Sequence, residues 1–173
     1  ARSLGYADLL QPELIVLWRQ EDGELPEDER WSCFDPARLR LVPLPVGRDE
    51  AGRPTATVVR CQALPVVAGR DPGEGVLACR LRLDGDAPRA LRVWTVASPG
   101  GQCRAALLVG DQVAFLHRAV SGAPQRLALA PLDGGAPARD PLPGLGGQIR
   151  TLEHRGGGVL RFAADPEGWF RPY

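Results

Sequence analysis

The sequence predicts an all-β protein made of antiparallel meanders of about ten short strands. Turn signals rich in glycine and proline recur about every ten residues, and the runs between them are too short for typical helices. The strongest pattern is at residues 90–132, where turns at 98–101, 110–111 and 121–124 separate four apolar-rich runs. A two-layer sandwich and a small propeller-like stack both fit this spacing.

The four runs of residues 90–132 are expected to share one apolar face. Side chains alternate between the two faces of a strand, and arginine is rarely buried without a partner, so Arg92 and Arg104 mark the outward face. The inward positions are then Leu91, Val93, Cys103, Ala105, Leu107, Val113, Phe115, Leu127 and Leu129. A sheet with one apolar face is unstable alone, so we expect the rest of the chain to cover that face.

The segment before residue 90 contains one expected helical turn and several strands. Ser3 caps a short turn of helix that Pro12 ends, and the apolar run of residues 13–19 is typical of a strand buried on both faces. Prolines restrict residues 31–46 to one short edge strand. The further expected elements are an acidic loop at 21–29, that edge strand at 39–42, a polar turn at 48–54, a strand at 55–64 that bends at Pro65 and continues through 66–67, and a strand at 76–83 between turns at 71–75 and 84–88.

The segment after residue 132 begins with a loop. Glycine and proline fill more than half of residues 133–147, so no strand is expected there. The remaining elements are strands at 148–153 and 159–163, hinged on the glycines of 156–158, and an aromatic plug for the core formed by Trp169 and Phe170.

Composition limits the class of protein. The 173 residues are 44% hydrophobic, enough for one core, and we expect residues 1–173 to form a single β domain. The formal net charge is zero, which argues against a dedicated nucleic-acid binder, and no apolar run approaches the roughly 20 residues of a membrane span. Residues 1–30 hold eight acidic and three basic residues, so this acidic N-terminal segment either is a solvated connection or attracts a basic partner.

Four cysteines point to the compartment. Cys33, Cys61, Cys79 and Cys103 are even in number, widely spaced, and for the last three the outward arginines beside them favour an inward side chain. Two disulfides in an exported protein, periplasmic or secreted, are the expected state. The alternative is buried thiols in a cytoplasmic protein. A zinc site is disfavoured because the chain has no CxxC pair.

The sequence contains few residues for catalysis. Its four serines are outside any G-x-S-x-G motif, and its histidines are His117 and His154. His117 shares the parity of Val113 and Phe115, so a hydrogen-bonded core histidine is expected; the alternative is a general base, with Cys103 as a nucleophile. We expect no enzyme activity, no cofactor and no metal site.

Surface residues remain as candidates for binding. Outward parity is shared by Arg80, Arg82, Arg92, Arg104, Arg126 and Arg161. Such arginines either form a solvated face or hold a carboxylate-rich partner through bidentate contacts. Trp94 shares the outward parity of Arg92, which is typical of an interface hot spot, unless the indole packs under a loop.

These observations predict an exported, non-catalytic protein-binding module whose turns present residues to one protein partner. Its most concrete form is an inhibitor or immunity protein that covers the active site of an envelope-degrading enzyme or toxin. The expected partner-binding residues are Arg92, Trp94, Ser98, Gly100, Gly101, Gln102, Ser121 and Gly122. The alternatives are a small hydrolase or ligand-binding domain that uses His117, and a subunit of a larger β-rich surface assembly.

Overall fold

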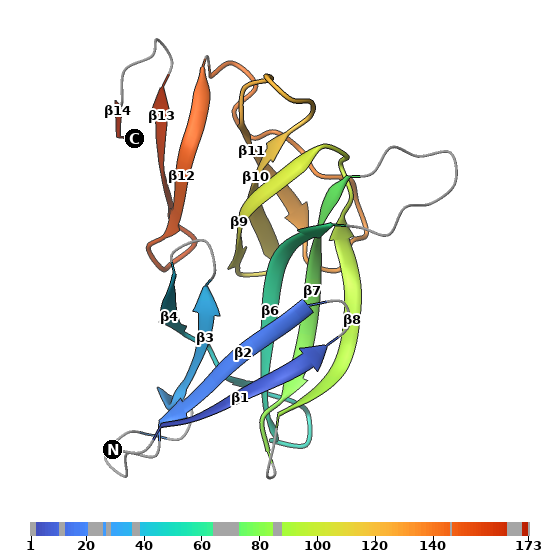
Figure 1. Cartoon of the computed structure of the whole chain (residues 1–173), viewed down its shortest axis with the longest axis vertical. Coiled ribbons are helices and arrows are strands. Elements are labelled where there is room, and N and C mark those ends of the chain that lie inside the picture. The colour runs from blue at the N-terminus through green and yellow to red at the C-terminus, as the bar shows by residue number, and fades with distance from the viewer. Residues whose placement is uncertain are drawn as a thin grey trace. The chain divides into compact units, whose positions relative to one another are not determined.

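The structure is a computed structural model that describes the backbone of residues 3–10, 13–20, 26, 29–35, 39–63, 73–84, 88–145, 147–165 and 171–172 (Figure 1). Within these ranges side chains are described from Pro26 onward, except those of Asp35, Arg171 and Pro172. The elements of this part of the chain are strands β1 to β14, which pair into antiparallel sheets, so the all-β prediction is confirmed. No helix among these residues is long and apolar enough to cross a membrane.

Contacts divide the chain into two compact units. Unit 1 comprises Ala1–Val58 and Cys79–Val93, and unit 2 comprises Val59–Ala78 and Trp94–Tyr173. Three strands of one sheet contribute residues to both units, and they are β6 (Pro54–Ala63), β7 (Glu74–Arg82) and β8 (Arg89–Ala97). Each unit has its own buried core, and the single domain expected from the sequence stays a prediction.

Unit 1 holds a four-stranded antiparallel sheet in the order β1-β2-β3-β4. Its strands are β1 (Ser3–Leu10), β2 (Glu13–Gln20), β3 (Trp31–Asp35) and β4 (Arg40–Pro43). The helical turn expected at residues 3–10 is wrong, because all eight residues of β1 pair with β2. A continuous ladder of cross-strand hydrogen bonds outweighs one weak capping signal at Ser3.

Residues 31–46 hold two strands where the sequence predicts one. The edge strand is confirmed, since β4 lies at the end of its sheet. The other strand, β3, was not expected, but its alternate residues Trp31 and Cys33 are buried and none of the three prolines of this segment lies inside it. The two-residue period was therefore present in the sequence, and the prolines obscured it.

The core of unit 1 joins the first sheet to strands of the sheet β5-β6-β7-β8, in which β5 is Gly47–Arg48. Backbone hydrogen bonds tie its segments together: Leu44 N–H donates to Trp31 O at 2.9 Å, and Leu83 N–H donates to Pro54 O at 3.0 Å. The buried core residues are Trp31, Cys33, Leu44, Ala56, Val58, Cys79, Leu81 and Leu83.

The buried side of β6 changes along the strand. Ala56 and Val58 pack in the core of unit 1, whereas Val59 and Cys61 pack in a core of unit 2. Since successive side chains point to opposite faces, the buried face changes between Val58 and Val59. The strand at 55–64 is confirmed for its described residues, while Pro65 and the continuation at 66–67 lie outside them.

Unit 2 contains two three-stranded sheets. Their strands are β9 (Gln102–Val109), β10 (Gln112–Arg118) and β11 (Arg126–Pro131) in one sheet, and β12 (Gln148–His154), β13 (Leu160–Asp165) and β14 (Arg171–Pro172) in the other (Figure 1). β12 and β13 confirm the strands expected at 148–153 and 159–163, and the glycines of 156–158 all have positive φ. Trp169 and Phe170 lie outside the described residues.

The sheet of β9, β10 and β11 has both faces buried. Val113 and Phe115 pack in a core with residues of β6, β7 and β8, whereas Ala114 and Leu116 pack in a core with residues of β12 and β13. All four side chains are 0–1% exposed. The expectation of a single apolar face is therefore wrong, because an unbroken apolar run is buried on both sides of its strand.

A β-bulge lies next to the centre of this sheet. The register of β9 and β10 shifts there, and two residues, Ala105 and Ala106, lie opposite Phe115. Ala105 has a φ of 54°. Side chains of β9 change faces at the bulge, so Cys103 packs in the core of Phe115 and Leu107 in the other. The sequence predicts both on one face, which is wrong because simple alternation carries no sign of the extra residue.

β8 does not continue the meander of β9 to β11, since it belongs to the sheet β5-β6-β7-β8. Leu91 and Val93, expected inward, are 43% and 44% exposed. Trp94, expected outward, is half-buried against the core of Phe115, and its Nε1–H donates to Leu132 O at 2.7 Å. The predicted directions of Leu91, Val93 and Trp94 are wrong because β8 pairs with β7 in the sheet β5-β6-β7-β8 and not with β9. The Trp94 indole packs under the loop that contains Leu132.

The arginines expected to form one outward face do not share a sheet. They lie on strands of three sheets, with Arg80, Arg82 and Arg92 in one, Arg104 and Arg126 in the second, and Arg161 in the third. Arg82 and Arg126 each contact a nearby segment. Arg82 Nε lies 3.5 Å from Asp84 Oδ1, and Arg126 binds a loop.

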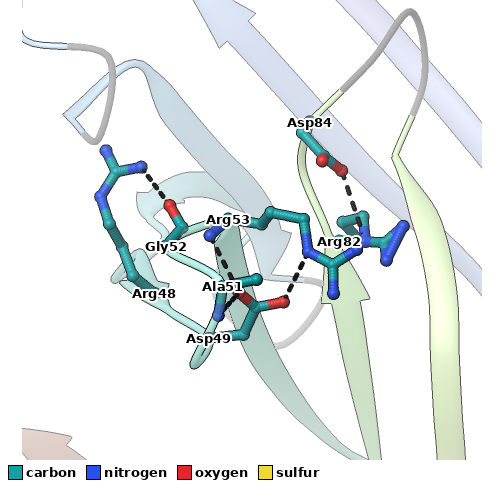
Figure 2. A network of polar contacts seen from close by, with 7 residues as sticks. All are labelled: Arg48, Asp49, Ala51, Gly52, Arg53, Arg82 and Asp84. Atoms are coloured by element: carbon teal, nitrogen blue, oxygen red, sulfur yellow. Dashed lines mark hydrogen bonds and ion pairs between the residues drawn. The ribbon is translucent and has the colours of Figure 1, made fainter.

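The polar turn expected at residues 48–54 is confirmed, and Asp49 organises it (Figure 2). Asp49 Oδ1 accepts the backbone N–H groups of Ala51 and Arg53, each at 2.9 Å, and Oδ2 accepts Arg53 Nε–H at 2.9 Å. Arg48 Nη1–H donates to Gly52 O at 3.0 Å, where glycine permits a φ of 75°. One carboxylate thus holds the turn between β5 and β6.

This turn is expected to loosen in acid. The backbone N–H of Arg53, and then its guanidinium, hold the pKa of Asp49 below its usual 3.8. A lowered folded-state pKa stabilises the turn above pH 3.8, and that stabilisation is lost as pH falls through the lower value. The protection of the Ala51 and Arg53 amides, measured by NMR as the ratio of the intrinsic to the observed exchange rate, should fall in that window. The Asp49→Asn variant should show no such transition in the protection of these amides. Unchanged protection of the wild type in acid would contradict the role given to the Asp49 carboxylate.

The glycine- and proline-rich loop of residues 133–147 is tied to β11 by Arg126. Its guanidinium donates to Leu142 O at 3.0 Å and to Leu145 O, and lies 3.3 Å from Asp140 Oδ2. A backbone bridge between Leu129 and Arg139 adds two hydrogen bonds of 2.9 Å. The loop is therefore held in place by hydrogen bonds to Arg126 and Leu129 of β11, without forming a strand of its own.

Arg126→Ala is expected to lower the free energy of unfolding by about 2 kcal/mol, because hydrogen bonds to a charged group are lost and carbonyls are left unpaired. The control is Arg155→Ala, whose ion pair with Glu153 at 2.9 Å is about half exposed on both sides. Such a surface pair contributes about 0.5 kcal/mol or less. Urea unfolding of both variants measures the difference, and equal losses would refute the role of Arg126.

The four cysteines are thiols, and no disulfide joins them, so the predicted disulfides are wrong. The inward direction expected for Cys61, Cys79 and Cys103 is confirmed, since Cys79 and Cys103 are buried and Cys61 is half-buried, and Cys33 is buried as well. Three of the Sγ atoms lie 3.5–4.0 Å from backbone carbonyls, those of Phe34, Arg80 and Glu74. Buried cysteine acts here as a small apolar residue with a weak S–H donor, and facing inward does not by itself bring two sulfurs together.

Alkylation without reductant is expected to label all four cysteines once the chain is denatured, as intact mass will show. In the native protein Cys103 should react slowest, because burial, and then the Glu74 carboxylate, raise the pKa of its thiol to about 12. If the denatured chain gains no label in mass, its cysteines are paired in disulfides, and the assignment of four thiols is wrong.

Candidate partner-binding surface

Two turns of unit 2 adjoin each other and form one surface, called here the turn surface and made of residues 98–102 and 119–123. The first turn connects β8 to β9 and the second connects β10 to β11. Their backbones are in close contact, since a Cβ added at Gly101 would overlap Arg118 O and Ala119 O. Gly101 also has a φ of 69°. Only glycine permits both this conformation and this approach.

Three hydrogen bonds from β10 and from the start of β7 hold the first turn. His117 Nε2 lies 2.7 Å from Gly100 O, and Glu74 N–H donates to Gly101 O at 2.8 Å. The Glu74 carboxylate accepts the N–H of Cys103 at 2.8 Å. These bonds fix Gly100, Gly101 and Cys103 to β10 and to the start of β7.

The tips of both turns face solvent. Val120 is 67% exposed, and Ala123 N–H closes its turn on Val120 O at 3.1 Å. The other exposed residues of the surface are Ser98, Pro99, Gly100, Gln102, Ala119, Ser121 and Gly122. None of these side chains carries a charge. The surface therefore offers backbone groups, small polar groups, and the apolar side chains of Pro99, Ala119 and Val120, so recognition depends on shape rather than on charge.

Six of the residues expected to bind a partner come together here. They are Ser98, Gly100, Gly101, Gln102, Ser121 and Gly122. The two others lie elsewhere, because Trp94 packs against the core and Arg92 is an exposed residue of unit 1. Whether these residues bind a partner stays a prediction.

Cys103 and His117 are brought together, directly opposite each other in β9 and β10. Cys103 is only 3% exposed, and with its raised pKa it stays a protonated thiol at neutral pH. The hydrogen bond expected of His117 is present, between Nε2 and Gly100 O, but the core position expected for it is wrong, because the residue lies next to the end of β10 and is only half-buried. This geometry supports the turn and provides no activated nucleophile.

Two residues of the site were not singled out from the sequence. Glu74 follows an Asp-Pro-Gly turn signal and looks like an ordinary solvated charge, so nothing local indicates its bond to Cys103. Val120 had a usable signal, because an apolar residue directly before the turn of 121–124 has no strand to pack in.

The described residues contain no group of three or more His, Cys, Asp or Glu side chains able to hold a metal ion. Comparison of the chain with protein-family models, with curated proteins and with solved structures finds no match.

Proposed function

We propose that this chain is a non-catalytic protein-binding module that holds a protein partner on the turn surface. The observation that carries the proposal is the contact of Gly101 with the 118–119 backbone, which joins two exposed turns into one preorganised surface. A surface already held in its bound shape loses little conformational entropy on association. An inhibitor or immunity protein that inserts these tips into an enzyme active site is the specific form we propose.

Export of the chain needs evidence other than disulfides. The sequence argument for a periplasmic or secreted protein used two disulfides, and the cysteines are thiols. The alkylation experiment above therefore comes before the choice of where to search for a partner: labelled cysteines direct the search to the cytoplasm, and unlabelled ones to the envelope.

The proposal is tested by affinity capture followed by reconstitution with the purified partner. Val120→Glu should weaken the complex at least tenfold, because a charge is placed in an uncharged contact. Val159→Glu is the matched control, since Val159 is also apolar and 57% exposed but lies outside the turn surface. Binding should change little with salt, because the surface has no charged side chain. No stable complex, or equal effects of the two variants, would refute the proposal.

An enzyme centred on His117 is the alternative from another class. His117→Ala discriminates: an enzyme would lose turnover and keep its fold, whereas a structural histidine loses about 1 kcal/mol of stability with its bond to Gly100 O. The buried, protonated Cys103 beside it gives the alternative no support.

A further inference from the structure

We propose that residues 89–93 of β8, called here the open edge, bind an acidic, extended segment of a protein partner by strand addition. The open edge belongs to unit 1 and shares no residue with the turn surface, which belongs to unit 2, so the inference goes beyond the function proposed above. It rests on the place of β8 at the end of its sheet, on two exposed apolar side chains, and on the charges around them.

β8 is a nine-residue strand at the end of the sheet β5-β6-β7-β8. An end strand keeps a row of backbone groups available for another strand, and proteins commonly cover or shorten long ones. A loop contacts the second half of β8: a Cβ at Gly134 would lie 2.8 Å from Thr95 O, and Leu132 O accepts the Trp94 indole N–H. The loop of residues 132–134 thus lies against the backbone of Thr95 and the indole of Trp94, both in unit 2, while Thr95 as a residue remains exposed.

The first half of the strand is exposed instead. Leu91 and Val93 are 43% and 44% exposed, and Arg89 beside them is exposed as well. Because side chains alternate along a strand, these three residues share one face, while Ala90 on the other face packs against the core of unit 1. Two apolar side chains exposed side by side on an end strand are what an added strand would cover.

The arginines on β8 and β7 favour an acidic segment as the added strand. Arg89 shares the face of Leu91 and Val93, β8 contains no acidic residue, and Arg80 is exposed on the neighbouring strand β7. An added strand with carboxylates near Arg89 and apolar side chains near Leu91 and Val93 would match this face in both respects. A basic strand would be repelled by Arg89 and Arg80.

The test uses a short synthetic peptide that alternates glutamate and valine, and a matched peptide that alternates lysine and valine. Titration of the full chain, followed by amide exchange, should show binding of the glutamate peptide alone, slower exchange within residues 89–93, and weaker binding as salt rises. Leu91→Glu and Arg89→Glu should each weaken binding about tenfold or more, because like charges meet across the new pair. Both positions are exposed, so the fold should survive, and thermal unfolding checks this.

Val159→Glu should bind the peptide like the wild type, and so should Val120→Glu, which separates failure of this inference from failure of the turn surface. The proposal is overturned if neither peptide binds, if both bind equally, or if Leu91→Glu and Arg89→Glu leave binding unchanged. It is also overturned if the chain self-associates in sedimentation and Leu91→Glu abolishes that association, since a second copy would then occupy the edge.

Discussion

Gly101→Ala is expected to destabilise the protein by about 3 kcal/mol or more, and to separate the two turns of the turn surface. The alanine Cβ would overlap Arg118 O and Ala119 O, and both are backbone atoms that cannot rotate away. It would also hold a φ of 69°, a conformation that costs an L-residue about 1 kcal/mol. Urea unfolding gives the loss in free energy, and amide exchange of residues 119–123 reports the separation.

Gly100→Ala is the matched control for this prediction. Gly100 has a φ of 79°, so it carries the same conformational cost, but a Cβ there would meet nothing within 4 Å. It should lose only about 1 kcal/mol. The difference between the two variants then isolates the contact between the turns, and a difference near zero would show that the turns do not depend on each other.

Phe115→Ala is expected to have the largest effect on stability, a loss of about 3–5 kcal/mol. Its side chain is 0% exposed at the centre of β10, opposite the β-bulge of β9, and its core draws on β6, β7, β8 and β11. Truncation leaves a cavity whose lining is held by several strands, so it cannot collapse to fill the space. Thermal unfolding should show a large fall in the midpoint.

The control for Phe115 is Val120→Ala, beyond the end of the same strand. Val120 is 67% exposed, so its truncation should change the free energy of unfolding by about 0.5 kcal/mol or less. A small loss for Phe115→Ala would mean that the face of the β9-β10-β11 sheet that carries Phe115 is not buried.

Local sequence was enough for most strands and turns. The strands at 55–63 and 112–118, the polar turn at Asp49 and the turns at 98–101 and 121–124 each follow from short patterns of β-branched residues, glycine and proline. The wrong predictions also came from short sequence patterns. Ser3 indicated a helix where β1 pairs with β2, and alternation along β9 gave no sign of the bulge at Ala105.

By itself, the sequence determined an all-β chain, inward cysteines and the two turns that carry the candidate binding residues, because each depends on neighbours a few residues apart. Tertiary structure alone decided that β8 joins a different sheet from β9, that the cysteines stay thiols, and that Gly101 meets the 118–119 backbone. Those outcomes depend on distances between strands far apart in the chain, and residue types along one strand contain no measure of such distances.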